Sequence, residues 1–260
     1  AEGDAQGGRG EEGGGEESTR HEEGGCEEDR REEGRTGQED RAGEKGPKGD
    51  SPLNAPRTPQ TSLPPLPERE EIALLEPFEG LGLNDIVLVA TRDDAERAAT
   101  ALLAAGVVGF DTESKPTFAK NEVSTGPHLV QFATRETAWL FQLHRTDCNE
   151  VLGALIGSEA LRKVGFGLSS DLSLIRQKLK VEPRSVHDID DEFRRRGYRR
   201  SVGVKTAVAL VFGQRFAKSR KATTSNWASH RLSEAQLRYA ANDAYASIRV
   251  FDALQDNRSR

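Results

Sequence analysis

The chain has 260 residues, of which 35% are hydrophobic and 31% charged, and its formal net charge is −6. This length accommodates one full domain with additional sequence, or two small domains. The two cysteines, Cys26 and Cys148, lie too far apart in the sequence to indicate a disulfide framework or a zinc site. No apolar run approaches the roughly 18–20 residues of a membrane-spanning helix, so we expect no membrane insertion.

The N-terminal sequence also argues against secretion or import into an organelle. It contains no apolar core of a signal peptide, and its many Glu residues are atypical of a transit peptide. The low cysteine content fits a reducing compartment. We therefore expect a cytoplasmic protein, or a nuclear one if the source is a eukaryote.

Charge is distributed unevenly along the chain. Residues 1–70 carry 10 Lys or Arg and 19 Asp or Glu, whereas residues 71–260 carry 27 and 24. Residues 1–50 contain almost no apolar side chains, so they cannot bury enough surface to offset chain entropy. Residues 51–68 are Pro-rich and typical of an extended linker. We predict a disordered acidic tail and linker over 1–70, which could also bind a protein partner, and one folded domain over 71–260.

The folded part alternates between predicted strands and helices. A short strand at 86–90 precedes an Ala- and Leu-rich helix at 93–105, and an apolar strand at 107–113 ends in charged residues. Strands at 129–133 and 138–143 are joined by a tight turn. The remaining predicted elements are a helix at 150–156, a strand at 162–166, and helices at 169–179, 204–212 and 234–254. This order predicts an α/β domain with a mixed sheet.

Two carboxylates stand at the end of the predicted strand 107–113. Asp111 and Glu113 are two residues apart, so their side chains point to the same face of the strand. Carboxylates this close repel one another and lose hydration, and a divalent cation would offset both costs. Mg²⁺ and Mn²⁺ prefer such oxygen ligands. Taken alone, the pair also fits a strand whose acidic end is simply exposed to water.

Three further residues have a chemical and a structural interpretation. Asp171 lies in the first turn of the predicted helix 169–179, where the helix dipole alone would stabilise a carboxylate. Tyr239 and Asp243 are about one turn apart in the last helix, on a stripe that also holds core residues. A carboxylate on an apolar stripe needs a partner. Alone, the two also fit an aromatic core residue and a capping or salt-bridged Asp.

The order of these residues resembles that of the DEDDy exonucleases of the ribonuclease H-like superfamily. That pattern is D-x-E on a strand, an Asp early in a middle helix, and Y-x-x-x-D on a late helix. The stretch SNWASHRLSEAQLRYAANDAYA at 225–246 is similar to the family's sequence there, and HLVQFAT and WLFQL correspond to its second and third strands. The resemblance is closest to the exonuclease domain of the Werner syndrome helicase, with ribonuclease D more distant. It covers about residues 75–255 and implies a ribonuclease H-like mixed β-sheet flanked by helices.

The resemblance implies a metal-dependent 3′–5′ exonuclease that uses two divalent ions, Mg²⁺ or Mn²⁺, and releases nucleoside monophosphates. Asp111 would bridge both ions, and Asp171 would support one of them. Glu113 and Asp243 would hold the ion that carries the attacking water, which Tyr239 would orient. The alternative is a catalytically silent nucleic-acid-binding module with the same fold, and the presence of all four carboxylates favours the enzyme.

A basic region in the second half of the chain would suit a nucleic-acid partner. Residues 160–230 hold 16 Lys or Arg against 6 Asp or Glu. Such a surface binds phosphates without sequence preference. The run at 194–200 fits a solvated surface as well as it fits such contact, whereas for 218–221 we favour contact. The residues that we predict to touch nucleic acid are Lys115, Lys218, Arg220 and Lys221.

The acidic run at 188–192 could also suggest a metal site. We interpret it instead as the N-terminus of a helix, where the helix dipole favours carboxylates. His187 beside it is expected to be structural, because two-metal hydrolysis needs no histidine. Trp227 is expected to pack in the core rather than to stack on a base.

Overall fold

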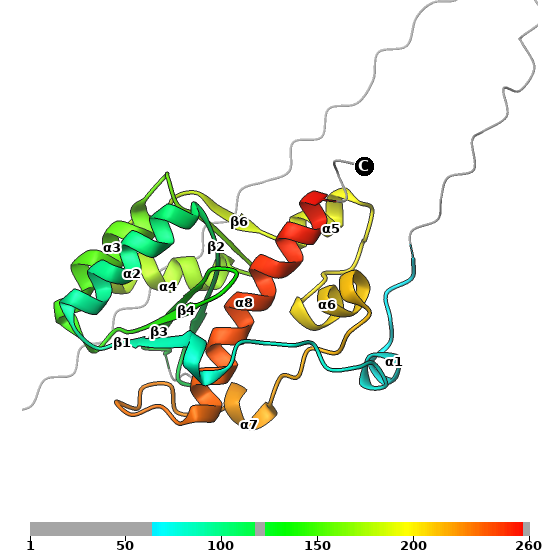
Figure 1. The fold of residues 1–260 in the computed structure, drawn as a ribbon, viewed down its shortest axis with the longest axis horizontal. Helices are drawn as coiled ribbons and strands as arrows, with labels where there is room; N and C mark the ends of the chain where they lie inside the picture. The colour runs from blue at the N-terminus through cyan, green and yellow to red at the C-terminus, as the bar shows by residue number, and fades with distance from the viewer. Residues whose placement is uncertain (1–63, 118–122, 257–260) are drawn as a thin grey trace, which may run out of the picture. The chain divides into compact units, whose positions relative to one another are not determined.

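The computed structural model describes residues 64–117 and 123–256. The predicted tail lies almost wholly in residues 1–63, outside the described residues, so its disorder and the domain boundary at residue 70 stay predictions. Within the described residues, six strands form one mixed sheet with helices on both faces (Figure 1). The predicted α/β class is therefore confirmed.

Three antiparallel strands form the middle of the sheet. The strands are β1 (Ile86–Val89), β2 (Val107–Glu113), β3 (Leu129–Ala133), β4 (Ala138–Gln142), β5 (Arg162–Gly165) and β6 (Val186–Asp188). Their order across the sheet is β1-β4-β3-β2-β5-β6. β3 runs antiparallel to β2 and β4, whereas β1 is parallel to β4, and β5 is parallel to both β2 and β6. β6 was not predicted, because three residues at a sheet edge are too few to show an alternating pattern.

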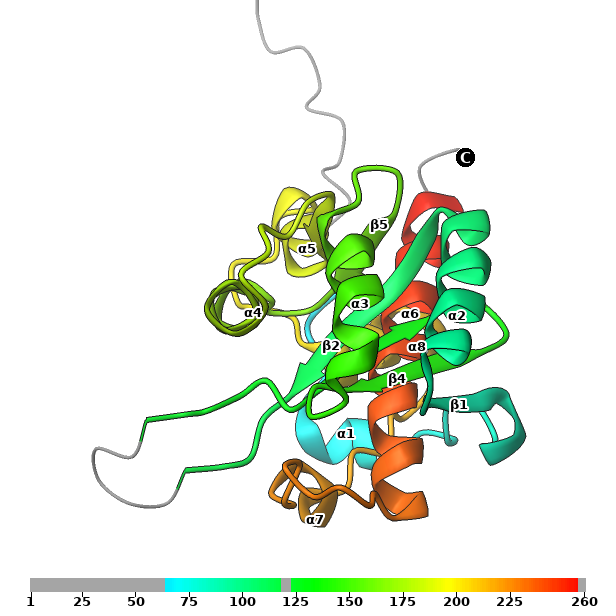
Figure 2. The ribbon, with the colours of Figure 1, turned by 90° about the vertical axis from the view of Figure 1, so that its left-hand side faces the viewer.

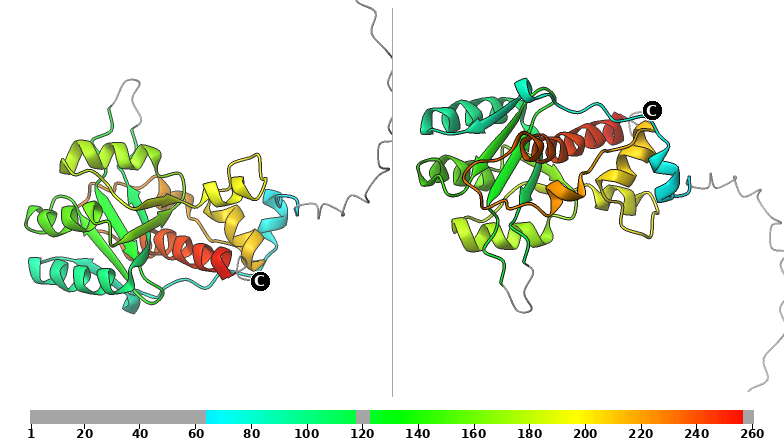
Figure 3. Two further views of the ribbon diagram at one scale, coloured as in Figure 1. Left: turned by 90° about the horizontal axis from the view of Figure 1, so that it is seen from above. Right: turned by 90° about the horizontal axis from the view of Figure 1, so that it is seen from below.

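Helices pack on each face of the sheet (Figure 2 and Figure 3). One face carries α2 (Arg92–Ala105), α3 (Asn149–Gly157) and α4 (Ser169–Leu179), and the other carries α8 (Glu234–Asp256) with α6 (Val204–Phe212) against it. The shorter helices are α1 (Arg69–Ala73), α5 (Asp190–Arg195) and α7 (Arg220–Thr223), with 3₁₀ turns at Leu83–Asp85 and Thr146–Cys148. Among residues 64–117 and 123–256, no helix has the length and apolar character that crossing a bilayer would require.

The start of α8 is fixed by a capping box. The amide of Gln236 donates to Ser233 Oγ at 3.3 Å, and the amide of Ser233 donates to Gln236 Oε1 at 3.0 Å. Downstream of this cap, Tyr239, Asp243 and Ala246 are buried and, at spacings of three and four residues, form one stripe along the helix. The helix therefore presents a phenol and a carboxylate to the same surface as its core residues.

A close approach between β2 and α8 sets the position of the site. A Cβ added to Gly109 would lie 1.8 Å from the carbonyl oxygen of Ala244, so a glycine is required where the helix crosses the strand. Gly109 lies two residues before Asp111, and Ala244 directly follows Asp243. The contact that brings the two backbones together therefore also brings the two carboxylates together.

Candidate active site

The carboxylates of β2 and α8 meet at the end of the strand. Oxygen atoms of Asp111, Glu113 and Asp243 lie within 4.8 Å of one another. Thr112, between the two acids of β2, is buried on the opposite face, as the alternation of side chains along a strand requires. Asp243 is 2% exposed, and its Oδ1 makes no hydrogen bond to the described residues. Clustered carboxylate oxygens with unused acceptor capacity are the donor set that Mg²⁺ or Mn²⁺ takes, so these residues fit the metal.

Burial and mutual repulsion raise the pKa values of this cluster. Burial, then the charge of Asp243, raises the pKa of Asp111 well above its ordinary range. Burial, then the charge of Asp111, raises the pKa of Glu113 to about 9. Burial also raises the pKa of Asp243, although the Lys218 ammonium opposes this. A divalent cation would reverse these shifts, because metal ligands bind deprotonated and their protons are released.

Asp171 approaches the same strand end from the other face of the sheet. It lies in the first turn of α4, as predicted, and Thr112 Oγ1 donates a hydrogen bond to its Oδ1 at 2.7 Å. Burial raises the pKa of Asp171, and the bond from Thr112 opposes that rise. The charge of Asp171 in turn raises the pKa values of Asp111 and Glu113. Asp171 is thus close to the three-carboxylate cluster without being part of it.

Thr112 is a site residue that the sequence did not reveal. Its neighbours in the D-T-E motif drew attention because they carry charge. The alternation of side chains along β2 places Thr112 on the face of the sheet that α4 covers. Nothing in the sequence shows which side chain of α4 it contacts. Its hydroxyl fixes the position of Asp171, which is the kind of support that metal-site carboxylates need.

Tyr239 lies one turn before Asp243 and is 8% exposed. Its hydroxyl and Thr223 Oγ1 are 3.0 Å apart, and its ring centre lies 5.8 Å from that of Trp227. Burial, followed by the charge of Asp243, raises the pKa of Tyr239 to about 12. The phenol therefore stays protonated at neutral pH and can orient a hydrogen-bonded group. Trp227 is 1% exposed, which confirms that it packs in the core.

Lys218 contacts the carboxylates themselves. Its Nζ lies 2.8 Å from Asp243 Oδ2 and 5.1 Å from the centre of the Tyr239 ring. It lines a cavity of about 340 Å³ together with Asp111 and Asp243. Burial opposes its charge, but the Asp243 carboxylate outweighs burial and raises the pKa of Lys218. Its ammonium is therefore part of the site, and the predicted contact with nucleic acid stays a prediction.

The other predicted nucleic-acid contacts lie around the cluster. Lys115 is exposed two residues after Glu113, and its backbone amide donates to His128 Nδ1 at 3.2 Å. Lys221 is exposed on α7. The side chain of Arg220 lies outside the described residues. Contact between these residues and nucleic acid stays a prediction.

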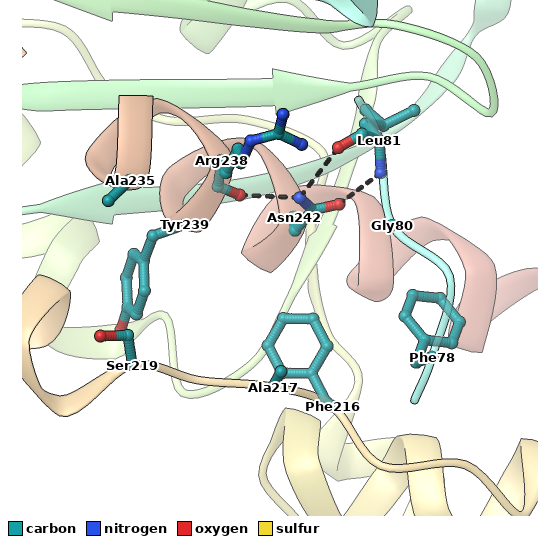
Figure 4. Close-up of a pocket in the computed structure, with 10 residues that line it drawn as sticks. All are labelled: Phe78, Gly80, Leu81, Phe216, Ala217, Ser219, Ala235, Arg238, Tyr239 and Asn242. Carbon is teal, nitrogen blue, oxygen red and sulfur yellow. Dashed lines mark hydrogen bonds between the residues drawn. The ribbon is translucent and has the colours of Figure 1, made fainter. Parts of the chain in front are cut away.

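A second cavity, of about 350 Å³, lies beside Tyr239 (Figure 4). Asn242 closes one side of it by accepting from the Leu81 amide at 2.6 Å and donating to the Leu81 carbonyl at 3.3 Å. Ala217 and Ser219 line this cavity, whereas Lys218 between them lines the carboxylate cavity. The segment between α6 and α7 therefore lines both cavities.

Other polar residues singled out in the sequence are structural. α5 begins at Asp190, which confirms that 188–192 leads into a helix. His187 Nε2 lies 3.1 Å from Glu192 Oε1, away from the carboxylate cluster. Two arginines of the run at 194–200, Arg195 and Arg196, also pair with Glu192. Part of that basic run therefore stabilises the fold.

The fold and the site together define a nuclease domain, with clustered carboxylates at a strand end of a mixed sheet crossed by a long helix. Residues 86–258 match the family model described as 3′–5′ exonuclease. The match extends over well more than half of the chain. The chain therefore belongs to the 3′–5′ exonuclease family.

Two curated relatives and one solved structure illustrate this membership. The exonuclease mut-7 homolog of Aedes aegypti is 28% identical over 207 residues, which are 69% of this chain and 28% of that protein. The mouse bifunctional 3′–5′ exonuclease/ATP-dependent helicase WRN is 25% identical over 150 residues, 57% of this chain and 11% of that protein. The EXO domain of Aedes aegypti Nibbler superposes with a TM-score of 0.59 at 22% identity, covering 70% of this chain and 93% of that domain.

These comparisons confirm the predicted family and its ribonuclease H-like fold. The predicted relation to the Werner helicase is found, but its rank as the nearest relative is not confirmed, because the mut-7 homolog is more similar. The Nibbler structure, at its low identity, shows a shared fold alone. The chain spans less than a third of the length of either curated relative.

Proposed function

We propose that this chain is an active 3′–5′ exonuclease that hydrolyses nucleic-acid phosphodiester bonds with two divalent metal ions and releases nucleoside monophosphates. The observation that carries the proposal is the meeting of Asp111, Glu113 and Asp243 within 4.8 Å. Their burial and repulsion are unfavourable in the absence of a cation. A module that only bound nucleic acid would gain nothing from that arrangement.

The position of each side chain suggests its role in the reaction. Asp111, Glu113 and Asp243 would hold metal directly, with Asp111 shared between two ions, and Asp171 would support the second from the Thr112 side. Bound Mg²⁺ or Mn²⁺ would activate a water and stabilise the departing 3′ oxygen. Tyr239, protonated at neutral pH, would hydrogen-bond that water and hold it in line with the phosphorus.

The substrate would be held by charge around the cluster. Lys115, Lys218, Arg220 and Lys221 would contact backbone phosphates, which requires no base recognition. Two of these contacts have support in the structure, since Lys115 is exposed two residues after the D-T-E motif and Lys221 is exposed beside the segment that carries Lys218. Binding of this kind weakens steeply with added salt.

The decisive experiment follows the release of nucleotides from the 3′ end. DNA and RNA oligonucleotides of one sequence, labelled at either end, would be incubated with Mg²⁺ or Mn²⁺ and the full chain, with Asp111→Asn as the inactive control. We expect stepwise shortening from the 3′ end by the wild type alone. Oligonucleotide binding without nucleotide release by the wild type would instead establish the silent module.

The acidic tail and the location of the protein belong to the same proposal. Residues 1–70, with their excess of 9 negative charges, would bind a protein partner. The protein would act in the cytoplasm, or in the nucleus of a eukaryote. Deleting residues 1–63, which leaves α1 and its cap intact, should remove co-purifying proteins without changing the activity, and fluorescence microscopy of the tagged chain would locate it. An unchanged set of co-purifying proteins would refute the role of the tail.

A further inference from the structure

One ammonium group is built into the carboxylate cluster. Lys218 Nζ lies 2.8 Å from Asp243 Oδ2, and the side chain is 26% exposed where it enters the cavity. Asp243 belongs to the group whose oxygens lie within 4.8 Å of one another. Lys218 therefore places a positive charge at the edge of the oxygen cluster that would receive a divalent metal ion.

An ammonium and a divalent cation at these oxygens would oppose one another. Both are attracted by the same carboxylates, and both need oxygen atoms at short range. Two cations separated by a few ångströms in a partly buried site repel strongly, because little water screens them. A metal ion that coordinates Asp243 would thus weaken the hold of that carboxylate on Lys218.

The Lys218 side chain is able to leave without rearranging the fold. Its ammonium is held by Asp243 and by the face of the Tyr239 ring, 5.1 Å from the ring centre. A lysine carries its charge on a flexible four-carbon stem, so its head can move while its backbone stays. Its neighbour Ser219 anchors the segment to α7, because the Ser219 carbonyl accepts a hydrogen bond from the Thr223 amide at 3.0 Å.

We propose that Lys218 is a built-in counter-ion of the carboxylate cluster and that a divalent metal ion displaces its ammonium on binding. Lys218 and the metal then compete, so the lysine lowers the affinity of the site for metal. The proposal rests on the proposed function, because it requires that the cluster bind a divalent metal ion.

The test measures Mn²⁺ binding to the full chain without nucleic acid, by calorimetry or by the electron paramagnetic resonance signal of free Mn²⁺. Lys218→Met should bind Mn²⁺ at least about 5-fold more tightly than the wild type, which is the lower end of usual couplings between ligands. Lys205 provides a graded control in the same cavity, because its charge also acts on Asp243 but it forms no ion pair with the described residues, so its loss should change Mn²⁺ affinity less. Lys205→Met and the charge-conserving Lys218→Arg should both stay within about 2-fold of the wild type.

A second readout guards against a variant that folds poorly. Saturating Mn²⁺ should raise the Tm of Lys218→Met by more than it raises that of the wild type, since tighter binding stabilises more. Lys218→Gln gives the same test if the Met variant does not fold. Equal or weaker Mn²⁺ binding by both neutral variants would overturn the competition alone. A folded wild type that binds no Mn²⁺ would overturn the proposed function as well.

Discussion

Two groups of buried acids in this molecule behave in opposite ways. On α5, Asp190 is 6% exposed, yet it accepts hydrogen bonds from the Val202 amide at 2.6 Å and Ser201 Oγ at 3.0 Å, and it pairs with Arg194 at 2.9 Å. Burial acts to raise the pKa of Asp190, but these partners outweigh burial and lower it. An acid that is supplied with donors in this way is part of the scaffold.

The carboxylates at the end of β2 have fewer hydrogen-bond donors and cations close to them. Among the described residues, Lys218 alone forms an ion pair with Asp111, Glu113 or Asp243, and the pKa values of the three acids rise. Asp243 is as buried as Asp190, while Asp111 and Glu113 are half-buried, so burial alone does not distinguish a structural acid from a functional one. The difference lies in how many donors and cations face the carboxylate, and an undersupplied cluster indicates a place for a cation that is not part of the chain.

A substitution at Asp111 should have the largest effect on activity and is the strongest test of the difference between the two groups of acids. Asp111→Asn keeps the shape of the side chain but removes the charge that the metal needs, so we expect kcat/KM for 3′ nucleotide release to fall at least about a thousand-fold. Asp190→Asn, assayed at a temperature where it is folded, should stay within about 3-fold of the wild type. If Asp190→Asn lost activity as severely as Asp111→Asn, the separation of the two groups would be wrong.

The free energy of unfolding should fall more on substitution of Asp190 than on substitution of Asp111, the reverse of the order expected for activity. Asp190→Asn leaves the solvent-exposed Arg194 without its partner and weakens the bond from the Val202 amide, so we expect the free energy of unfolding to fall by about 1.5–3 kcal/mol. Asp111→Asn relieves repulsion and should not lower it in EDTA. Urea unfolding of both variants in EDTA measures this, and an equal loss in both would contradict the comparison.

Sequence alone was enough for the elements with a long pattern. β2 and α8 agree with their predicted ranges within two residues, because β2 is an apolar run that ends in charge and α8 is a long helix with a capping box at its start. β6, α1 and α7 have three to five residues each and were missed, because they lack the apolar run that marks the equally short β1. Their place is determined by tertiary contacts.

For the site, too, the sequence indicated some features and missed others. The family pattern indicated all four carboxylates and Tyr239, but no pattern along the chain shows which side chains pair across it. Thr112 and Asp171 are 59 positions apart, and their hydrogen bond depends on how α4 packs against β2. The pairing of Lys218 with Asp243 was missed for the same reason, since a basic run in sequence reads as surface.

The Thr112 hydroxyl offers a smaller and more specific test. Thr112→Val keeps the branched shape but removes the donor to Asp171, so we expect kcat to fall about 10- to 100-fold, as when a partner of a metal ligand is lost. Thr112→Ser keeps the hydroxyl and should retain most of the activity. Full activity in Thr112→Val would show that Asp171 does not need this hydrogen bond. Asp171 would then be better explained as a structural acid, like Asp190.

The smallest effect, at Glu113, tests the physical basis of the comparison. Its pKa in the folded chain, about 9, lies above its ordinary value of 4.5, so it favours folding below pH 4.5 and this contribution is lost as pH rises toward 9. In EDTA, the free energy of unfolding of the wild type should therefore decline over this range. Glu113→Gln should remove part of the decline and be more stable by about 1–2 kcal/mol at pH 8.

Glu113 and Asp190 should change the free energy of unfolding in opposite directions as pH rises. The lowered pKa of Asp190 means that its contribution is present above its ordinary value of 3.8 and is lost as pH falls below it. Urea titrations of the wild type, Glu113→Gln and Asp190→Asn between pH 3 and pH 9 would separate the two slopes. Saturating Mg²⁺ should then reverse the order at pH 8, making the wild type more stable than Glu113→Gln, because the ion stabilises the charged cluster that it binds. A Glu113→Gln variant that stays more stable in Mg²⁺ would mean that the repulsion at this strand end is not relieved by metal.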